Sequence, residues 1–489
     1  MRLSDGARIA VIGAGPSGVA AAKYALEAGF EPIVFEATER IGGQWNTTAA
    51  HSGVWPGMRT NTSRELTAFS DFPPPQDYPL HPAAEQIREY LESYARTYAV
   101  VERIRFGTRV HAVRPGWTVD GEPFDAVVAA SGRFRAPRFP PTVADFAGDL
   151  LHTYDYPGAD AFEDRTVLVY GNGVSGVEIA SDLGGRARAI SAFRKPRYVI
   201  QKVVGGVASD WQWYTAFGAL ERRRLTAEEW AQRQRARVLR VAGHPADFGA
   251  PAPDDDLRIA GVSLCQGYLQ QVRDREVVCR PGISAVAGRT VAFTDGTSAD
   301  VDAIVCATGY DPNLPYLSEV AGAGTWVDTD LYQRTFHPGL PGLGVIGQFL
   351  AQGPYWPLLE LQARWIFSVW SGALAPPEPR RMREMIATPR PILESHNTLA
   401  LVLSEESGVS PDPLAWPALT EPLLFGPMLP SRYRLSGPGA RASAAQDYRR
   451  ALATAPRAPV DPGDLDALRS FGLSAAADRV TAAYAGAAP

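Results

Sequence analysis

The chain contains the same glycine pattern twice, each time directly after a short apolar run. The first copy reads Gly13-Ala14-Gly15-Pro16-Ser17-Gly18 and the second reads Gly171-Asn172-Gly173-Val174-Ser175-Gly176. In such a turn the first glycine allows a tight exit from a strand, the second lets the backbone approach a phosphate, and the third lets the next helix pack closely on the strand. Each copy therefore predicts a strand, a phosphate-binding turn and a helix.

The residues that follow the two copies differ in charge at one matching position. Twenty-three residues after its first glycine, the first copy has Glu36 and the second has Arg194. A carboxylate there suits the ribose hydroxyls of an unphosphorylated adenosine, whereas a guanidinium suits a 2′-phosphate. Lys195 can share the charge of that phosphate, although a solvated basic turn is the alternative for this pair. We therefore predict that one chain holds both FAD and NADPH.

A second internal repeat supports two nucleotide-binding units. Residues 125–132 are echoed by residues 302–309, each a short apolar strand that stops at a small hydroxyl residue and a glycine. With 489 residues, the chain is also too long for one core. We predict an α/β fold of two Rossmann-like dinucleotide-binding domains, a smaller NADPH domain inserted in a larger FAD domain. The expected boundaries are 1–160 and 301–489 for FAD, the latter with a C-terminal extension, and 161–300 for NADPH.

Composition excludes several classes of partner. The formal net charge of −5 gives no electrostatic argument for nucleic acid or an acidic membrane. The sequence contains no run of 18 or more apolar residues, so we expect no membrane-spanning helix. The three cysteines are scattered and form no C-x-x-C pair, which argues against a metal site or a disulfide framework. We expect a cytoplasmic protein without a bound metal, with a homodimer as one option.

Three other segments carry weaker expectations. Residues 83–99 have apolar side chains at helical spacing, which predicts an amphipathic helix. Residues 219–242 read as one basic helical stretch, either a solvated face over the domain junction or a docking face for a membrane or partner. The Ala- and Pro-rich end after Ala453 is expected to be a loosely held tail.

The region between the glycine motifs resembles a known family. The run from Phe146 to Tyr156 matches the fingerprint F-x-G-x-x-x-H-x-x-x-[FY] of flavin-containing monooxygenases. Residues 59–65, 360–365 and 425–439 are similar to further landmarks of that family. The resemblance implies that NADPH reduces FAD, that molecular oxygen forms a flavin hydroperoxide, and that one of its oxygen atoms passes to nitrogen or sulfur of a small nucleophilic substrate while the other leaves as water. Within this family the chain resembles the N,N-dimethylaniline monooxygenases, and we expect it to lack the membrane anchor of their microsomal members.

The resemblance also implies roles for individual residues. Asn61 would lie over the flavin as the catalytic residue, where a neutral amide donates a hydrogen bond without supplying an acidic proton; a turn cap is the alternative. Tyr355 and Trp356 would narrow the flavin pocket, and His152 would serve the domain junction and not the chemistry. The predicted cofactor-binding residues are Gly13, Gly15, Ser17, Gly18, Glu36, Gly43, Gln44, Trp45, Thr60, Gly171, Gly173, Ser175, Gly176, Arg194, Lys195, Thr308 and Gly309.

Other reactions use similar folds. A Baeyer–Villiger monooxygenase would attack a ketone, but its fingerprint ends in Trp where this chain has Tyr156. A disulfide reductase or electron-transfer flavoprotein shares the glycine motifs, yet the former needs a cysteine pair that the spacing of Cys265 and Cys279 does not offer. An NADPH oxidase would differ only in releasing hydrogen peroxide.

Overall fold

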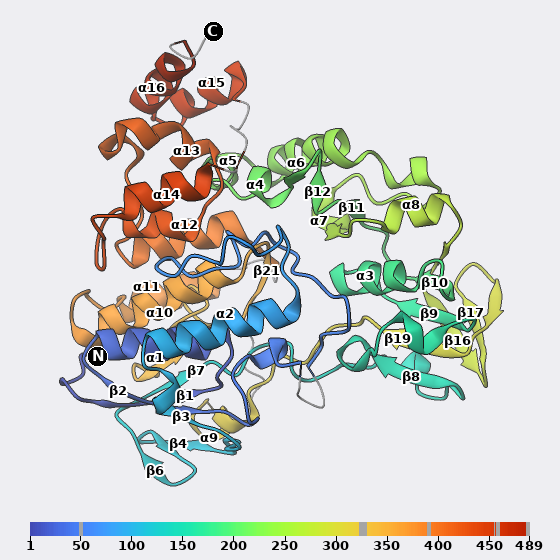
Figure 1. Ribbon diagram of the computed structural model, residues 1–489, viewed down its shortest axis with the longest axis horizontal. Helices are drawn as coiled ribbons and strands as arrows, with labels where there is room; N and C mark the ends of the chain where they lie inside the picture. The colour runs from blue at the N-terminus through green and yellow to red at the C-terminus, as the bar shows by residue number, and fades with distance from the viewer. Residues whose placement is uncertain (48–51, 322–329, 389–392, 454, 456–459, 486–489) are drawn as a thin grey trace.

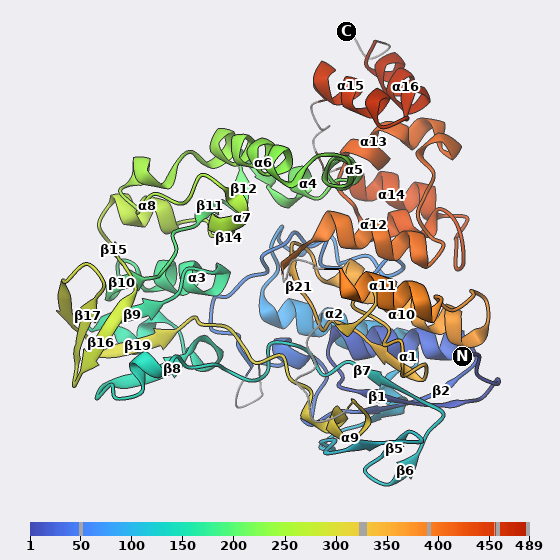
Figure 2. The same cartoon turned by 180° about the vertical axis from the view of Figure 1, so that it is seen from behind.

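Two five-stranded parallel sheets organise the protein and lie on opposite sides of the molecule (Figure 1, Figure 2). The computed structural model describes residues 1–47, 52–321, 330–388, 393–453, 455 and 460–485. The first sheet has the order β20 (Leu343–Val345), β7 (Ala126–Ala129), β1 (Arg8–Ile12), β2 (Glu31–Phe35) and β3 (Ile104–Arg105). The second has the order β15 (Val277–Arg280), β10 (Arg188–Ala192), β9 (Thr166–Tyr170), β19 (Ala303–Cys306) and β8 (Asp149–His152).

Each sheet repeats the unit that the glycine motifs predict. Helix α1 (Pro16–Glu27) follows β1, and helix α3 (Val174–Leu183) follows β9. The central strands are apolar and buried because helices cover one face of each sheet and a small three-stranded antiparallel sheet packs on the other. Helices α2 (Ala84–Thr97) and α10 (Trp356–Ser371) join α1 in the largest apolar core. The two-Rossmann α/β fold is confirmed.

The chain crosses between the sheets along two paired linkers. Pro137 and Tyr310 form an antiparallel bridge, so the outgoing and returning segments run side by side. Strand β8 precedes residue 160 yet pairs with β19 of the second sheet. The domain boundaries near residues 160 and 300 stay a prediction.

The basic stretch at 219–242 is two helices and not one. Helix α5 (Ala216–Arg224) ends before Thr226, whose hydroxyl caps α6 (Ala227–Ala242) by accepting the Glu229 N–H at 3.2 Å. Because a Thr at this position with Glu three residues later forms a capping box, the sequence starts a new helix there.

The expectation of a loosely held C-terminal tail is wrong for its described part. Helices α15 (Pro462–Ser470) and α16 (Ser474–Ala485) bury Leu468 and Val480 against Phe217 of α5 and Phe425 of α13 (Thr420–Phe425). Apolar residues at helical spacing outweigh the loop-like Ala/Pro composition.

The remaining elements surround these cores. The helices are α4 (Asp210–Trp213), α7 (Leu257–Ala260), α8 (Tyr268–Arg273), α9 (Ser318–Ala321), α11 (Pro379–Ala387), α12 (His396–Glu406), α13 (Thr420–Phe425) and α14 (Ala444–Leu452). The strands are β4 (Val113–Arg114), β5 (Thr118–Val119), β6 (Glu122–Pro123), β11 (Tyr198–Ile200), β12 (Val203–Val204), β13 (Val207–Ala208), β14 (Val262–Leu264), β16 (Ile283–Ala287), β17 (Thr290–Phe293), β18 (Ser298–Asp300), β21 (Leu350–Gln352) and β22 (Leu393–Ser395). None of the helices described here is long and apolar enough to cross a bilayer.

Candidate active site

The first glycine turn has the geometry of a nucleotide-binding turn. Gly13 has φ +104°, and a Cβ there would lie 2.8 Å from Ala130 O. A Cβ on Gly18 would lie 1.7 Å from Gly13 O, so only glycine lets α1 start this close to β1. The first turn of α1, where Ser17 is buried, therefore directs its unpaired N–H groups beyond the end of the strand.

Glu36 is held beside this turn at the end of β2. Its Oε2 accepts the Ala14 N–H at 2.8 Å, and its Oε1 accepts from Thr38 N and Thr38 Oγ1, both at 2.8 Å. A carboxylate offers about four acceptor positions. Three of them are used by these hydrogen bonds, so roughly one remains free to accept. The fixed carboxylate can accept one more hydrogen bond from a ribose hydroxyl.

The segment Gly43-Gln44-Trp45 lies against the same turn. It forms a short 3₁₀ helix, and a Cβ on Gly43, which has φ +56°, would lie 3.0 Å from Gly15 Cα. Trp45 is buried in the core next to α1, whereas Gly43 is exposed and Gln44 half-buried. The structure thus brings the two predicted flavin-binding segments together, with Trp45 as a packing residue.

The second glycine turn repeats this geometry but leaves more room. Gly171 has φ +120°, and a Cβ on Gly176 would lie 1.9 Å from Gly171 O. A Cβ on Gly173 would meet nothing within 4 Å, and Ser175 is exposed beside it. The N-terminus of α3 therefore faces open space that a phosphate can enter.

Arg194 and Lys195 lie where the sequence predicts, just beyond β10, and both are exposed. A Cβ on Gly282 would lie 3.0 Å from Arg194 Cγ, which places the arginine stem over the segment after β15. The two cations therefore stand at the strand ends of the second sheet, the side from which α3 starts.

Thr308, Gly309 and His152 meet at the crossover. Thr308 Oγ1 donates to Arg138 O at 2.5 Å, and Gly309 O lies 3.0 Å from His152 Nε2. His152 Nδ1 accepts the Tyr154 N–H at 3.1 Å, and burial lowers the pKa of this fully buried ring. Through these contacts His152 connects the two linkers that run between the sheets. A cofactor role for Thr308 and Gly309 stays a prediction.

Asn61 lies in a turn that other parts of the chain hold firmly. Thr60 is buried, its N–H donates to Pro82 O at 2.9 Å, and its carbonyl faces His81 Nδ1 at 3.1 Å. Asn61 Oδ1 is buried and has no hydrogen-bond partner among the described residues. A buried polar atom without a partner is costly, so this oxygen is available to accept a hydrogen bond from a bound group or a water molecule.

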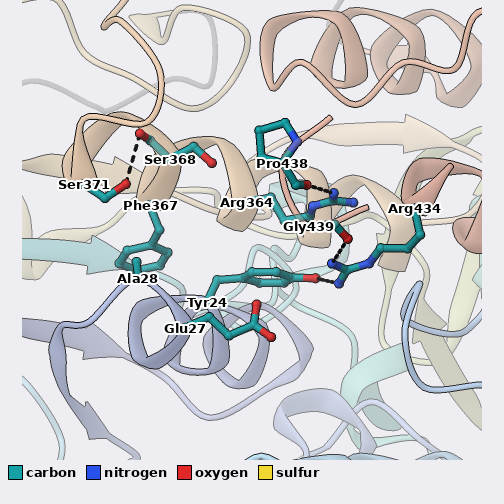
Figure 3. Close-up of a pocket in the computed structure, with 10 residues that line it drawn as sticks. All are labelled: Tyr24, Glu27, Ala28, Arg364, Phe367, Ser368, Ser371, Arg434, Pro438 and Gly439. Carbon is teal, nitrogen blue, oxygen red and sulfur yellow. Dashed lines mark hydrogen bonds between the residues drawn. The ribbon is translucent and has the colours of Figure 1, made fainter. Parts of the chain in front are cut away.

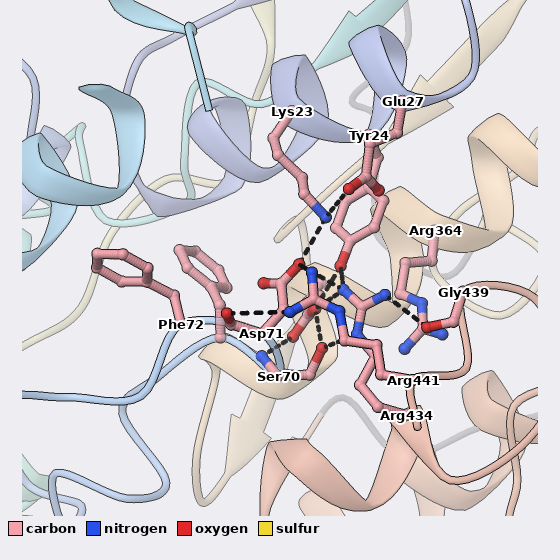
Figure 4. Close-up of polar contacts among 12 residues, drawn as sticks. Lys23, Tyr24, Glu27, Ser70, Asp71, Phe72, Arg364, Arg434, Gly439 and Arg441 are labelled. Atoms are coloured by element: carbon pink, nitrogen blue, oxygen red, sulfur yellow. Dashed lines mark hydrogen bonds and ion pairs between the residues drawn. The ribbon is translucent and has the colours of Figure 1, made fainter. Parts of the chain in front are cut away.

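A buried ionic network fixes the other end of the Asn61 segment (Figure 4). Asp71 Oδ2 pairs with Lys23 Nζ at 2.7 Å and Arg434 Nη2 at 2.8 Å. Glu360 Oε2 accepts the Ser70 N–H at 2.7 Å. Burial alone would raise the pKa of Asp71, but the two cations outweigh it and hold this pKa below its usual value. The segment that follows the Asn61 turn and the two family landmarks that contain Glu360 and Arg434 thus converge on α1.

The pocket in Figure 3 is not part of this site. It has a volume of about 180 Å³ and lies beside Tyr24 and Glu27, toward the C-terminal end of α1 and away from the glycine turn. The guanidinium of Arg364 at this pocket donates to Tyr433 O at 2.9 Å and Pro438 O at 2.7 Å. These donors already have partners, so the pocket offers no built ligand site.

Trp356 does not line a pocket, contrary to the expectation for this segment. It is 4% exposed, and its ring centroid lies 5.0 Å from that of Phe69 and 5.5 Å from that of Tyr90. Its place in the first turn of α10 directs it into the core. Tyr355 is half-buried, and its hydroxyl accepts the Ala351 N–H at 2.9 Å.

Sequence reasoning missed the residues that reach the Asn61 turn from the second half of the chain. Ser63 N–H donates to Asp210 Oδ2 at 2.5 Å, and Trp211 Nε1 donates to Ser63 Oγ at 3.0 Å. Lys202 Nζ donates to Thr60 O at 3.4 Å. No local motif predicts such long-range contacts. The only local indication was the Asp210-Trp211 pair itself, because a tryptophan is usually buried.

Comparison with known proteins gives one consistent family. Residues 6–457 match the family described as flavin-binding monooxygenase-like. Dimethylaniline monooxygenase [N-oxide-forming] 2 of Rattus norvegicus is 30% identical over 480 residues, which cover 88% of this chain and 89% of the relative.

Two solved structures share the fold. S-allyl-L-cysteine S-oxygenase from Allium sativum has a TM-score of 0.61 at 23% identity and covers 96% of this chain and 98% of its own. An open structure of cyclohexanone monooxygenase has a TM-score of 0.59 at 18% identity, covering 82% and 98%. The match to the family model, which spans nearly the whole chain, confirms the predicted cofactors FAD and NADPH. The chain belongs to the flavin-binding monooxygenase-like family and is a flavin-containing monooxygenase.

Proposed function

We propose that this enzyme oxygenates nitrogen or sulfur in a small nucleophilic molecule. Relatives that cover 88% of the chain are named for N-oxide formation, and the fold is shared with an S-oxygenase. The observation that carries the proposal is Asn61, a neutral amide whose buried Oδ1 has no hydrogen-bond partner in the part of the chain that the structure describes. Transfer of oxygen to a nucleophile needs no strong base in the protein.

The two glycine turns fit the two nucleotides. The backbone of Gly15 and the carboxylate of Glu36 would hold FAD, and the open space at Gly173 with Arg194 would hold NADPH. When bound, FAD reduced by NADPH supplies the oxygen-activating chemistry. The protein itself supplies placement. A division into 1–160 with 301–489 for FAD and 161–300 for NADPH gives each glycine turn its own domain, while the boundary strands β8 and β19 pair in the second sheet.

Neither the Asn61 amide nor the His81 ring supplies an acidic proton at neutral pH. Asn61 can donate through its amide without losing a proton. Burial, with Lys202 nearby, lowers the pKa of His81 to about 4, so its ring is neutral at pH 7. A site of this kind orients an oxygen atom by hydrogen bonding while giving little help to its release as hydrogen peroxide.

The cysteines do not support a disulfide reductase. Burial raises the pKa of Cys265 and Cys279 and raises that of Cys306 to about 12, the reverse of what a reactive thiol needs. The likeness to cyclohexanone monooxygenase, at 18% identity, concerns the fold and does not favour a ketone substrate. Cytoplasmic location and a homodimer stay predictions.

Product analysis with a tertiary amine, a thioether and a cyclic ketone tests the proposal. We expect an N-oxide or sulfoxide and no ester from the ketone. Asn61→Ala should keep its bound flavin and its NADPH consumption but release hydrogen peroxide in place of product, whereas Gln76→Ala, an exposed amide in the same segment, should behave as wild type. Product formation near the wild-type level in Asn61→Ala would refute the assigned role.

A further inference from the structure

The short helix α4 lies against the turn that carries Asn61. This helix belongs to the segment between β11 and β14, far from residue 61 in the sequence. Asp210 and Trp211, 4% and 5% exposed, both contact Ser63: the carboxylate accepts its N–H at 2.5 Å, and the indole N–H donates to its hydroxyl at 3.0 Å. Asp210 and Trp211 thus both hold Ser63, which lies two positions beyond Asn61. We call these two hydrogen bonds the grip on Ser63.

Ser63 begins a helical turn, which makes its backbone N–H an important donor. The N–H groups of Leu66 and Thr67 donate to Ser63 O at 3.0 and 2.9 Å. The first N–H groups of such a turn have no partner within it and need an outside acceptor. Ser63 is fully buried, so water cannot replace Asp210 without a rearrangement.

A second contact holds the other side of Asn61. Lys202 Nζ donates to the carbonyls of Arg59 and Thr60, both at 3.4 Å, and forms an ion pair with Glu178. Glu178 lies on α3, the helix that starts at the second glycine motif. Residues of the second nucleotide-binding half therefore hold the backbone on both sides of Asn61.

We infer that Asp210 and Trp211 are positioning residues that fix Asn61 for oxygen transfer. This inference rests on the proposed function and adds residues from the second half of the chain to that site. If the grip is lost, the flavin and NADPH sites keep their own contacts, but the Asn61 amide no longer stays in one place. Reducing equivalents from NADPH then leave as hydrogen peroxide more often than as product.

Hydrogen–deuterium exchange of the holoenzyme tests the grip directly, in peptides that cover residues 59–67. Asp210→Ala should speed exchange in this segment about ten- to a hundred-fold, the range expected when a charge-assisted hydrogen bond is lost. Asp210→Asn keeps an acceptor oxygen and should restore slow exchange. Trp211→Phe should speed exchange less, and Gln212→Ala, exposed on the same helix, should not change it.

The same variants are then assayed for the fraction of NADPH that yields product, with KM for NADPH and the anaerobic rate of flavin reduction measured alongside. We expect Asp210→Ala and Trp211→Phe to lower this fraction at unchanged KM and reduction rate, and Asp210→Asn to recover it. Unchanged exchange in both damaging variants, or faster exchange with an unchanged product fraction, would overturn the inference. Should Asp210→Ala fail to fold, Trp211→Phe carries both measurements. A wild type that oxygenates no substrate would refute the proposed function, while the exchange data would still decide whether the grip exists.

Discussion

Two glycines of the second nucleotide turn should respond to alanine in opposite ways. A Cβ on Gly176 would lie 1.9 Å from Gly171 O and 3.2 Å from Ala307 Cβ, and a backbone carbonyl cannot move aside cheaply. A Cβ on Gly173 would meet nothing within 4 Å, and this residue has φ −63° and ψ 177°, which alanine also adopts. One substitution therefore strains the fold, and the other fills the space offered to the nucleotide.

The magnitudes follow from these contacts. Gly176→Ala should lower the free energy of unfolding by about 3 kcal/mol or more, because overpacking against backbone costs at the upper end of the usual range. Gly173→Ala should change it by less than about 1 kcal/mol, since a poorer N-cap opposes a stiffer unfolded chain. A clash of about 1–3 kcal/mol with a phosphate would weaken NADP⁺ binding about 5- to 150-fold.

Thermal unfolding and titration calorimetry with NADP⁺ separate the two effects. We expect Gly173→Ala to unfold within a few degrees of wild type, to retain its flavin, and to bind NADP⁺ weakly. Wild-type NADP⁺ affinity in Gly173→Ala would place the nucleotide elsewhere, and wild-type stability in Gly176→Ala would refute the close packing of α3 on β9.

Other perturbations test the charged groups. Arg194→Ala should raise KM for NADPH about ten-fold with little change for NADH, as steady-state kinetics would show; equal effects on both would count against a 2′-phosphate contact. Burial, with Glu65 nearby, raises the pKa of Asp210 from 3.8 to about 7, so the folded chain binds more protons than the unfolded one in this range. Unfolding free energy should therefore fall by about 2–3 kcal/mol from pH 5 to pH 8, a slope that Asp210→Asn should lack in denaturant titrations at both pH values. Asp71→Asn should cost about 3–5 kcal/mol in the same titration because it leaves buried cations unpaired, whereas Asp447→Asn, in an exposed pair, should cost less than about 1 kcal/mol.

Local pattern was sufficient for the framework of this protein. The glycine spacing and apolar runs predicted β1, β9 and α3, and the helix observed at Val174–Leu183 begins directly after Gly173. These features depend on neighbours in sequence, because a tight turn and close helix packing need glycine whatever the rest of the chain does.

Contacts between distant segments were out of reach of the same reasoning. The sequence suggested that Trp356 narrows the flavin pocket, but in the structure its position in α10 packs its ring against Phe69 and Tyr90. The grip of Asp210 on Ser63 joins residues 147 positions apart, and no periodicity encodes it. The C-terminal helices were mistaken for a loose tail because composition says little about what a short apolar face can pack against.

Product analysis under ¹⁸O₂ tests the central claim most directly. The purified enzyme is supplied with NADPH, ¹⁸O₂ and a tertiary amine or thioether, and the product mass is measured together with hydrogen peroxide. If the enzyme oxygenates nucleophiles, each N-oxide or sulfoxide molecule should carry one ¹⁸O atom, and the amount of product should account for most of the NADPH consumed. Hydrogen peroxide equal to the NADPH consumed, with no labelled product from any amine or thioether, would contradict it.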